Sequence, residues 1–135
     1  MTAPFSQAPL VKKLALKPGS HMLVIAPPAG YRDLLGELPT GAEVAETSGT
    51  VDGTFDWIHL FVTTQAELER QLPAIKSRVA PGGVFWVSFP RAKSATDLNR
   101  TILMGLVPRF ALDIVTNVAV NDDWTAYRLK PLAAR

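Results

Sequence analysis

Residues 21–38 constrain the fold of this chain more than any other stretch. Residues 22–26 form a continuous apolar run, which is typical of a parallel strand covered on both faces. After a short turn, apolar residues recur at the i, i+3, i+4 and i+7 positions of a helix, at Tyr31, Leu34, Leu35 and Leu38. A buried strand, a tight turn and a helix with one apolar face therefore form the first unit of the fold.

Two later apolar runs predict further strands of the same sheet. Residues 55–62 are apolar except for Asp56 and His59 and are rich in aromatic residues, and residues 84–89 form a second apolar run. The segment between them completes a strand, helix, strand unit, whose right-handed connection makes the two strands parallel. We therefore expect residues 22–26 and 55–62 to be adjacent at the centre of a mainly parallel sheet with helices on both faces.

The helix predicted between these two strands has a clear start and an internal proline. Residues 64–67 fit a capping box, and the apolar stripe that follows consists of Leu68, Leu72, Ile75 and Val79. Pro73 removes one backbone hydrogen bond from the helix interior, at a cost of about 3 kcal/mol. We expect either a kink at Pro73 or two short helices.

Shorter segments complete the sheet. Residues 42–46 predict a short second strand, and the turn-rich linker at 47–54 is too short to hold a crossover helix and another strand. A helix is expected over residues 98–106. Residues 111–120 and 124–129 predict two antiparallel strands joined by a tight turn.

Bulk composition predicts one globular domain without a metal centre. With 135 residues and 47% hydrophobic content, the chain matches a single domain, which we assign to residues 9–135 after a flexible arm at residues 1–8. The chain has no cysteine, and His21 and His59 are too few and too separated to suggest a metal site. The net charge of +2 comes without a dense cationic run, which argues against nucleic-acid binding. The sequence contains neither a signal-peptide pattern nor an apolar run of membrane-spanning length, so we expect a cytoplasmic protein.

Several phrases of the sequence occur in an order that is known from one class of fold. They are Leu-Lys-Pro-Gly at 16–19, Phe-Asp-Trp-Ile-His at 55–59, Ala-Pro-Gly-Gly-Val-Phe-Trp-Val-Ser at 80–88 and the closing hairpin. This order resembles the core of the Rossmann-like, S-adenosylmethionine-dependent methyltransferases. A small bacterial family of unknown function, which looks like a trimmed version of that core, is similar in four segments, residues 9–14, 86–91, 95–98 and 122–124.

This resemblance implies an α/β fold, a Rossmann-like three-layer sandwich. The sheet would have about six strands, mainly parallel, with an antiparallel C-terminal hairpin strand. One strand and one helix of the methyltransferase core would be missing between residues 46 and 55.

The turn after the first strand departs from the methyltransferase pattern. A glycine-rich turn with an acidic residue is expected there, whereas this chain has Ala-Pro-Pro-Ala-Gly at 26–30. Pro27 and Pro28 delete two backbone donors and add bulk where the amino-acid part of the cofactor must approach closely. We therefore expect no bound cofactor, with S-adenosylmethionine as the alternative. If it binds, the resemblance implies contacts at Ala29, Gly30, Tyr31, Glu46 and Thr63, where Glu46 either accepts hydrogen bonds from the ribose or remains a solvated carboxylate.

A polar cluster is expected at the carboxyl ends of the strands, where open parallel sheets bind their ligands. It consists of Arg91, Lys93, Asp97, Asp122 and Trp124. The cations and the nearby helix N–H groups would suit an anion; alternatively, Arg91 or Lys93 pairs with Asp122 and fixes the hairpin. Trp124 would either stack on a ligand or pack as an edge plug.

Candidate catalytic residues are not evident in the sequence. His59 has the ordinary pKa of a general base, but it alternates with Trp57 and Phe61 in an apolar strand. We therefore interpret His59 as a buried, neutral, hydrogen-bonded residue. Our leading hypothesis is a non-catalytic methyltransferase-like domain that binds a small molecule or a protein, a second copy of itself included. The alternative is an active S-adenosylmethionine-dependent methyltransferase with a rebuilt cofactor loop.

Overall fold

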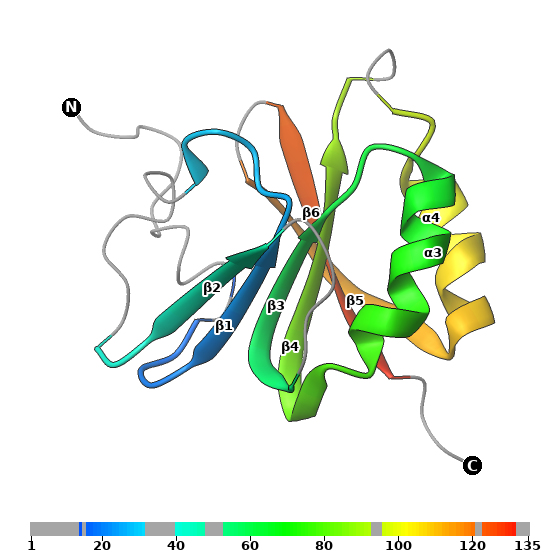
Figure 1. Ribbon diagram of the computed structural model, residues 1–135. Coiled ribbons are helices and arrows are strands. Elements are labelled where there is room, and N and C mark those ends of the chain that lie inside the picture. The colour runs from blue at the N-terminus through cyan, green and yellow to red at the C-terminus, as the bar shows by residue number, and fades with distance from the viewer. Residues whose placement is uncertain are drawn as a thin grey trace.

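The computed structural model describes residue 14 and residues 16–31, 40–47, 53–92, 96–120 and 123–131. In chain order the elements are β1 (His21–Ile25), β2 (Glu43–Thr47), β3 (Phe55–Phe61), α3 (Gln65–Lys76), β4 (Val79–Pro90), α4 (Arg100–Leu106), the 3-10 helix η2 (Val107–Phe110), β5 (Leu112–Ala119) and β6 (Trp124–Pro131) (Figure 1). The predicted arm at 1–8 and the predicted helix beyond Tyr31 lie outside the described residues.

The described strands form one sheet in the order β2-β1-β3-β4-β6-β5. β1 pairs in parallel with both β2 and β3, and β3 pairs in parallel with β4. β6 is antiparallel to β4 and to the edge strand β5. The predicted central pair, the parallel majority and the antiparallel C-terminal strands are therefore confirmed.

Of the two outcomes predicted at Pro73, the division into two short helices is wrong. α3 runs unbroken over 12 residues with Pro73 inside it. Pro73 is exposed, so water can solvate the carbonyl group of Glu69 that loses its helical partner. On the other side of α3, three buried side chains, Leu68, Leu72 and Ile75, attach the helix to the sheet. Packing of this apolar face outweighs the loss of one hydrogen bond.

β4 begins five residues before the predicted strand at 84–89. Residues 80–83 lie inside β4, at an irregularity in its pairing with β3. Phe55 is opposite Val79 and Trp57 is opposite Val84, so β3 advances by two residues while β4 advances by five. The Pro-Gly-Gly sequence therefore makes a bulge within the strand and not a turn before it.

Both faces of the sheet carry a buried core. α3 and α4 cover one face (Figure 1). On the opposite face the buried cluster contains Leu14, Leu16, Tyr31 and two tryptophans. The indole N–H groups of Trp57 and Trp86 both donate to the carbonyl oxygen of Leu14, at 2.7 and 2.8 Å. These two bonds fix Leu14, in the segment before β1, on the sheet.

We expect the centre of the sheet to dominate stability. Leu60 and Val87 are opposite each other on β3 and β4 and are fully buried. Truncation of either to alanine should lower the free energy of unfolding by about 2–4 kcal/mol, because it removes apolar contacts and leaves a cavity. Arg70→Ala, at an exposed position on α3, should change it by less than about 0.5 kcal/mol. Urea denaturation measures all three, and similar losses at Arg70 and Leu60 would show that the core is placed wrongly.

Candidate functional site

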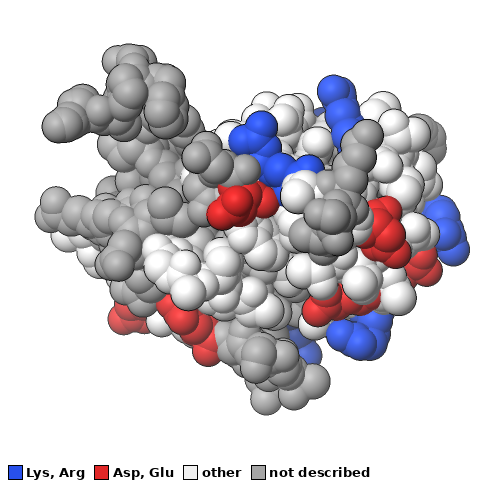
Figure 2. Space-filling view, turned by 90° about the horizontal axis from the view of Figure 1, so that it is seen from above, with Lys and Arg blue, Asp and Glu red and all other residues white. Residues whose placement is uncertain are grey.

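The carboxyl ends of β1–β4 lie at one edge of the sheet, the edge that Figure 2 shows from above. Backbone contacts connect the loops at this edge. The N–H group of Arg91 donates to the carbonyl oxygen of Asp123 at 2.8 Å, and Pro90 is opposite Trp124 in the sheet. The carboxylate of Asp97 accepts a 2.7 Å hydrogen bond from the N–H group of Gln65, at the start of α3. The loops after β3 and β4 and the β5–β6 connection thus share one rim, as expected.

The turn after β1 has an unusual backbone. Ala26 has a φ of 55° and Gly30 a φ of 83°, so the chain visits the left-handed region at both ends of the turn. Pro27 and Pro28 have no N–H group. The N–H group of Tyr31 donates back to the carbonyl oxygen of Pro28 at 3.2 Å. Of residues 27–31, only Ala29 and Gly30 therefore have an N–H group that makes no hydrogen bond within the turn.

Two other predicted cofactor contacts lie on the same edge. Glu46 is exposed near the end of β2, and its partner in the sheet is Val24 of β1. Thr63 follows β3, and its N–H group donates to the carboxylate of Glu67 at 2.9 Å. The side chain of Thr64 in turn accepts from the N–H group of Glu67 at 3.1 Å, which confirms the predicted cap of α3. Thr63 therefore serves the start of the helix, and Glu46 is an exposed residue at the same edge.

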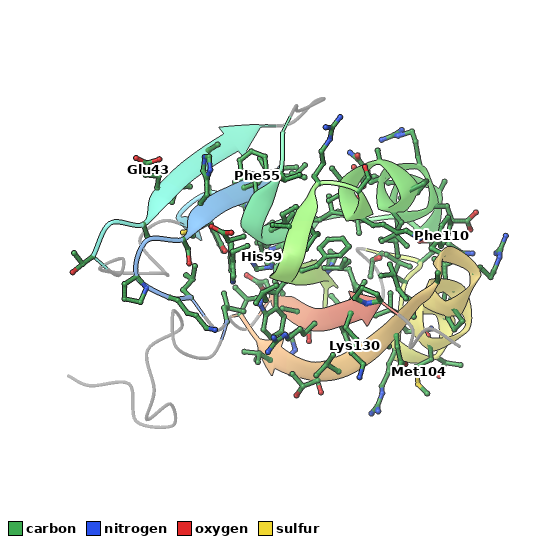
Figure 3. All side chains as sticks on the ribbon, turned by 90° about the horizontal axis from the view of Figure 1, so that it is seen from below. Glu43, Phe55, His59, Met104, Phe110 and Lys130 are labelled. Atoms are coloured by element: carbon green, nitrogen blue, oxygen red, sulfur yellow. The ribbon has the colours of Figure 1, made fainter. Side chains whose placement is uncertain are left out.

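His59 is the centre of a buried polar chain just beneath this rim. Its Nδ1 atom lies 2.7 Å from the hydroxyl oxygen of Tyr31, and its Nε2 atom lies 2.5 Å from that of Ser88. All three residues are buried, and His59 stacks on Phe61 with ring centroids 4.1 Å apart. Figure 3 shows His59 in the interior of the molecule. Burial lowers the pKa of His59 to about 3, so the imidazole is neutral at physiological pH.

This geometry confirms the interpretation of His59 as a structural residue. A neutral imidazole donates from one ring nitrogen and accepts at the other, which suits a hydroxyl on each side. With both nitrogens bonded and the ring fully buried, His59 has no free position from which to accept a proton from a ligand. Its contact with Tyr31 instead connects the central strand β3 to the end of the turn at 26–30.

Sequence reasoning missed Ser88 and the role of Tyr31. Tyr31 is counted above among the apolar positions of a helix, yet its hydroxyl is a buried hydrogen-bond partner of His59. Ser88 is the one polar residue in the run at 84–89. A lone serine in one predicted central strand and a lone histidine in its neighbour are a signal that could have indicated this pair, since buried polar side chains need partners.

The predicted polar cluster is only partly described. Arg91 and Asp97 are exposed at the rim, and Asp97 caps α3. Trp124 is half-buried and contacts Phe61 edge-on, with ring centroids 5.2 Å apart, which matches the expected edge plug. Lys93 and Asp122 lie outside the described residues. Figure 2 shows cationic and anionic side chains next to each other on this face.

The described residues contain neither a metal-ligand cluster nor a helix that could span a membrane. Within those ranges, no group of three or more His, Cys, Asp or Glu residues is arranged to hold a metal ion. No helix in the same ranges has the length and apolar character needed to cross a membrane.

The fold is that of known methyltransferases, although the sequence alone finds no relative. No family model matches the chain, and no curated protein is similar to it in sequence. Among solved structures, ribosomal protein L11 methylase from Lactobacillus delbrueckii subsp. bulgaricus superimposes with a TM-score of 0.64 at 12% identity, over 91% of this chain and 75% of that one. N-methyltransferase NodS from Bradyrhizobium japonicum WM9 gives 0.61 at 14% identity, over 91% and 90%.

A third structure was solved with a bound ligand. It is a complex of DhpI with SAH, which superimposes with a TM-score of 0.62 at 14% identity, over 93% of this chain and 83% of that one. At such low identities the similarity shows the fold alone, because one fold serves many activities. The chain thus has the Rossmann-like α/β fold of the methyltransferases, as the resemblance in sequence implies.

Proposed function

We propose that this chain, which has the fold of the S-adenosylmethionine-dependent methyltransferases, is a binding domain that does not transfer methyl groups. Its ligand site is the rim at the carboxyl ends of β1–β4. The observation that supports this proposal is the turn at 26–30, which keeps the position of the methyltransferase cofactor turn but carries Pro27 and Pro28. Ligands of open α/β sheets bind at this edge because the loops there diverge and leave a crevice.

The residues of this turn do not fit the amino-acid part of S-adenosylmethionine. A carboxylate held by a turn needs several N–H donors and close approach of the backbone. Here Pro27 and Pro28 lack the N–H group, and the amide of Tyr31 donates to Pro28. The exposed carboxylate of Glu46 does fit a hydroxyl donor such as a ribose. The rim is therefore better suited to a nucleoside than to the complete cofactor.

The alternative function is an active methyltransferase with an atypical turn. The comparisons favour it in one respect, because DhpI was solved with SAH and the glycopeptide N-methyltransferase MtfA, with a TM-score of 0.55, was solved with S-adenosylmethionine. They give no support to the expectation that no cofactor binds. S-adenosylmethionine is accordingly the first ligand to test.

We expect weak binding that owes little to the amino-acid part of the cofactor. Calorimetry of the wild-type chain at neutral pH should give a Kd for S-adenosylmethionine of about 1 mM or weaker. Adenosine, which lacks the methionine part, should bind within about threefold of this affinity, because the turn contributes few hydrogen bonds to the carboxylate. Glu46→Ala should weaken both ligands equally. Micromolar binding of S-adenosylmethionine, with adenosine far weaker, would instead establish a working cofactor site.

A further inference from the structure

A cavity lies at the opposite edge of the sheet from the rim. It has a volume of about 520 Å³, which is within the range of small-molecule sites. Apolar side chains from three strands form most of its wall, namely Val79, Ala80, Phe85, Leu112 and Leu129. Neither the methyltransferase-like rim nor the proposed function involves these residues.

The cavity follows from a split in the sheet between β4 and β6. Their pairing begins at Phe85 opposite Leu129. β6 continues to Pro131, which pairs with Leu112 of β5, whereas the first residue of β4, Val79, pairs with Phe55 of β3. The residues of β4 before Phe85 therefore pair only with β3, and the residues of β6 after Leu129 pair only with β5. The gap between these two strand ends is the cavity.

The bulge at residues 80–83 is what directs β4 away from β6. Gly82 has a φ of 77°, which favours glycine. A Cβ atom on Gly83 would lie 2.9 Å from the carbonyl oxygens of Ala80 and Asp56, so only glycine fits there. The bulge is thus closely packed, and it gives the cavity a fixed wall. Bulges of this kind often occur beside functional sites.

The charged residues that line the cavity are both cations, and one of them, Lys130, is opposite Asp113 of β5 in the sheet. Lys76, in the last turn of α3, donates from its ammonium group to the carbonyl oxygen of Phe110, which uses one of its three N–H bonds. Lys130 is exposed near the end of β6 and lines the cavity. No Asp or Glu occurs among the described residues that line the cavity. An apolar wall with two cations at its border is complementary to an apolar molecule that ends in one anionic group.

We propose that this cavity binds a small apolar carboxylate, with its hydrocarbon part against Phe85, Leu112 and Leu129 and its carboxylate at Lys76 and Lys130. Such a site is separate from the rim, so the two ligands would bind independently.

Octanoate is the probe, and its uncharged analogue octanamide is the matched control. In amide NMR spectra of the full chain, octanoate should shift the signals of Gly82, Gly83 and Leu129 and leave Ala29 and Gly30 unchanged. Octanamide should bind about fivefold more weakly, because it lacks the negative charge that attracts the two ammonium groups. Lys130→Met should weaken octanoate by about the same factor and leave octanamide unaffected.

Two further variants complete the test. Arg70→Ala removes an exposed cation outside the cavity and should leave octanoate binding unchanged. Lys76→Met should weaken octanoate further when it is combined with Lys130→Met, with amide spectra confirming that the variant is folded. The proposal is overturned if octanoate and octanamide bind equally, if Lys130→Met has no effect, or if the shifts occur at the rim. Failure at this cavity would leave the binding of adenosine at the rim unaffected, so the two proposals are tested separately.

Discussion

Acidification from pH 7 to pH 5 should cost this protein about 2 kcal/mol of stability through His59 alone. In the unfolded chain His59 has an ordinary pKa of 6.5, and burial in the folded chain lowers the pKa of His59 to about 3. At a pH between the two pKa values, the unfolded chain binds a proton at His59 and the folded chain does not. The contribution is therefore complete above pH 6.5 and is lost, at about 1.4 kcal/mol per pH unit, as the pH falls toward 3.

His59→Gln is the matched control for this effect. A glutamine can still donate and accept hydrogen bonds toward Tyr31 and Ser88, but it does not titrate. Urea denaturation of both proteins at pH 5, 6 and 7 should show a steeper loss of stability in the wild type. Carboxylates that titrate in this range contribute equally to both chains and cancel in the comparison. Parallel pH dependence in the two proteins would show that the imidazole at position 59 is accessible to protons in the folded state.

The sequence predicts the sheet well because the apolar runs are long and nearly pure. Except for Ala26 and Val62, the residues of the runs 22–26, 55–62 and 84–89 lie in strands of the described sheet, and their order in the sheet is consistent with right-handed connectivity. The predicted and observed strand ends differ where the backbone conformation of a single residue ends the strand. Ala26 is outside β1 because its backbone enters the left-handed region, which apolar character does not indicate.

The departures from prediction arise where tertiary contacts outweigh local preferences. Pro73 is tolerated because the opposite face of α3 is buried, and the Pro-Gly-Gly sequence at 81–83 is part of β4 because the strand continues its pairing with β3 beyond the bulge. The local sequence shows neither the burial of one face of α3 nor the continued pairing of β4 with β3. The candidate site shows the same limit: the sequence predicts which loops meet at the carboxyl edge of the sheet, but the pairing of Tyr31 with His59 joins residues 28 positions apart and emerges only from the fold.

Replacing both prolines of the turn with glycine should create affinity for S-adenosylmethionine. Pro27→Gly combined with Pro28→Gly restores two N–H donors and removes the side chains that block close approach. One additional hydrogen bond to the carboxylate of the ligand is worth about 1.5 kcal/mol, or roughly tenfold in Kd. We therefore expect the double variant to bind S-adenosylmethionine at least about tenfold more tightly than the wild type.

Adenosine is the internal control for this gain, because it has no carboxylate and should bind both proteins equally. The Pro27→Ala, Pro28→Ala variant restores the donors but retains a Cβ at each position, so its affinity for S-adenosylmethionine should be intermediate. Glycine increases the conformational entropy of the unfolded chain and so lowers stability. Thermal melting checks that the glycine variant is still folded. If the folded glycine variant binds S-adenosylmethionine no better than adenosine, the prolines are not what separates this chain from the methyltransferases, and the cofactor site must be limited elsewhere on the rim.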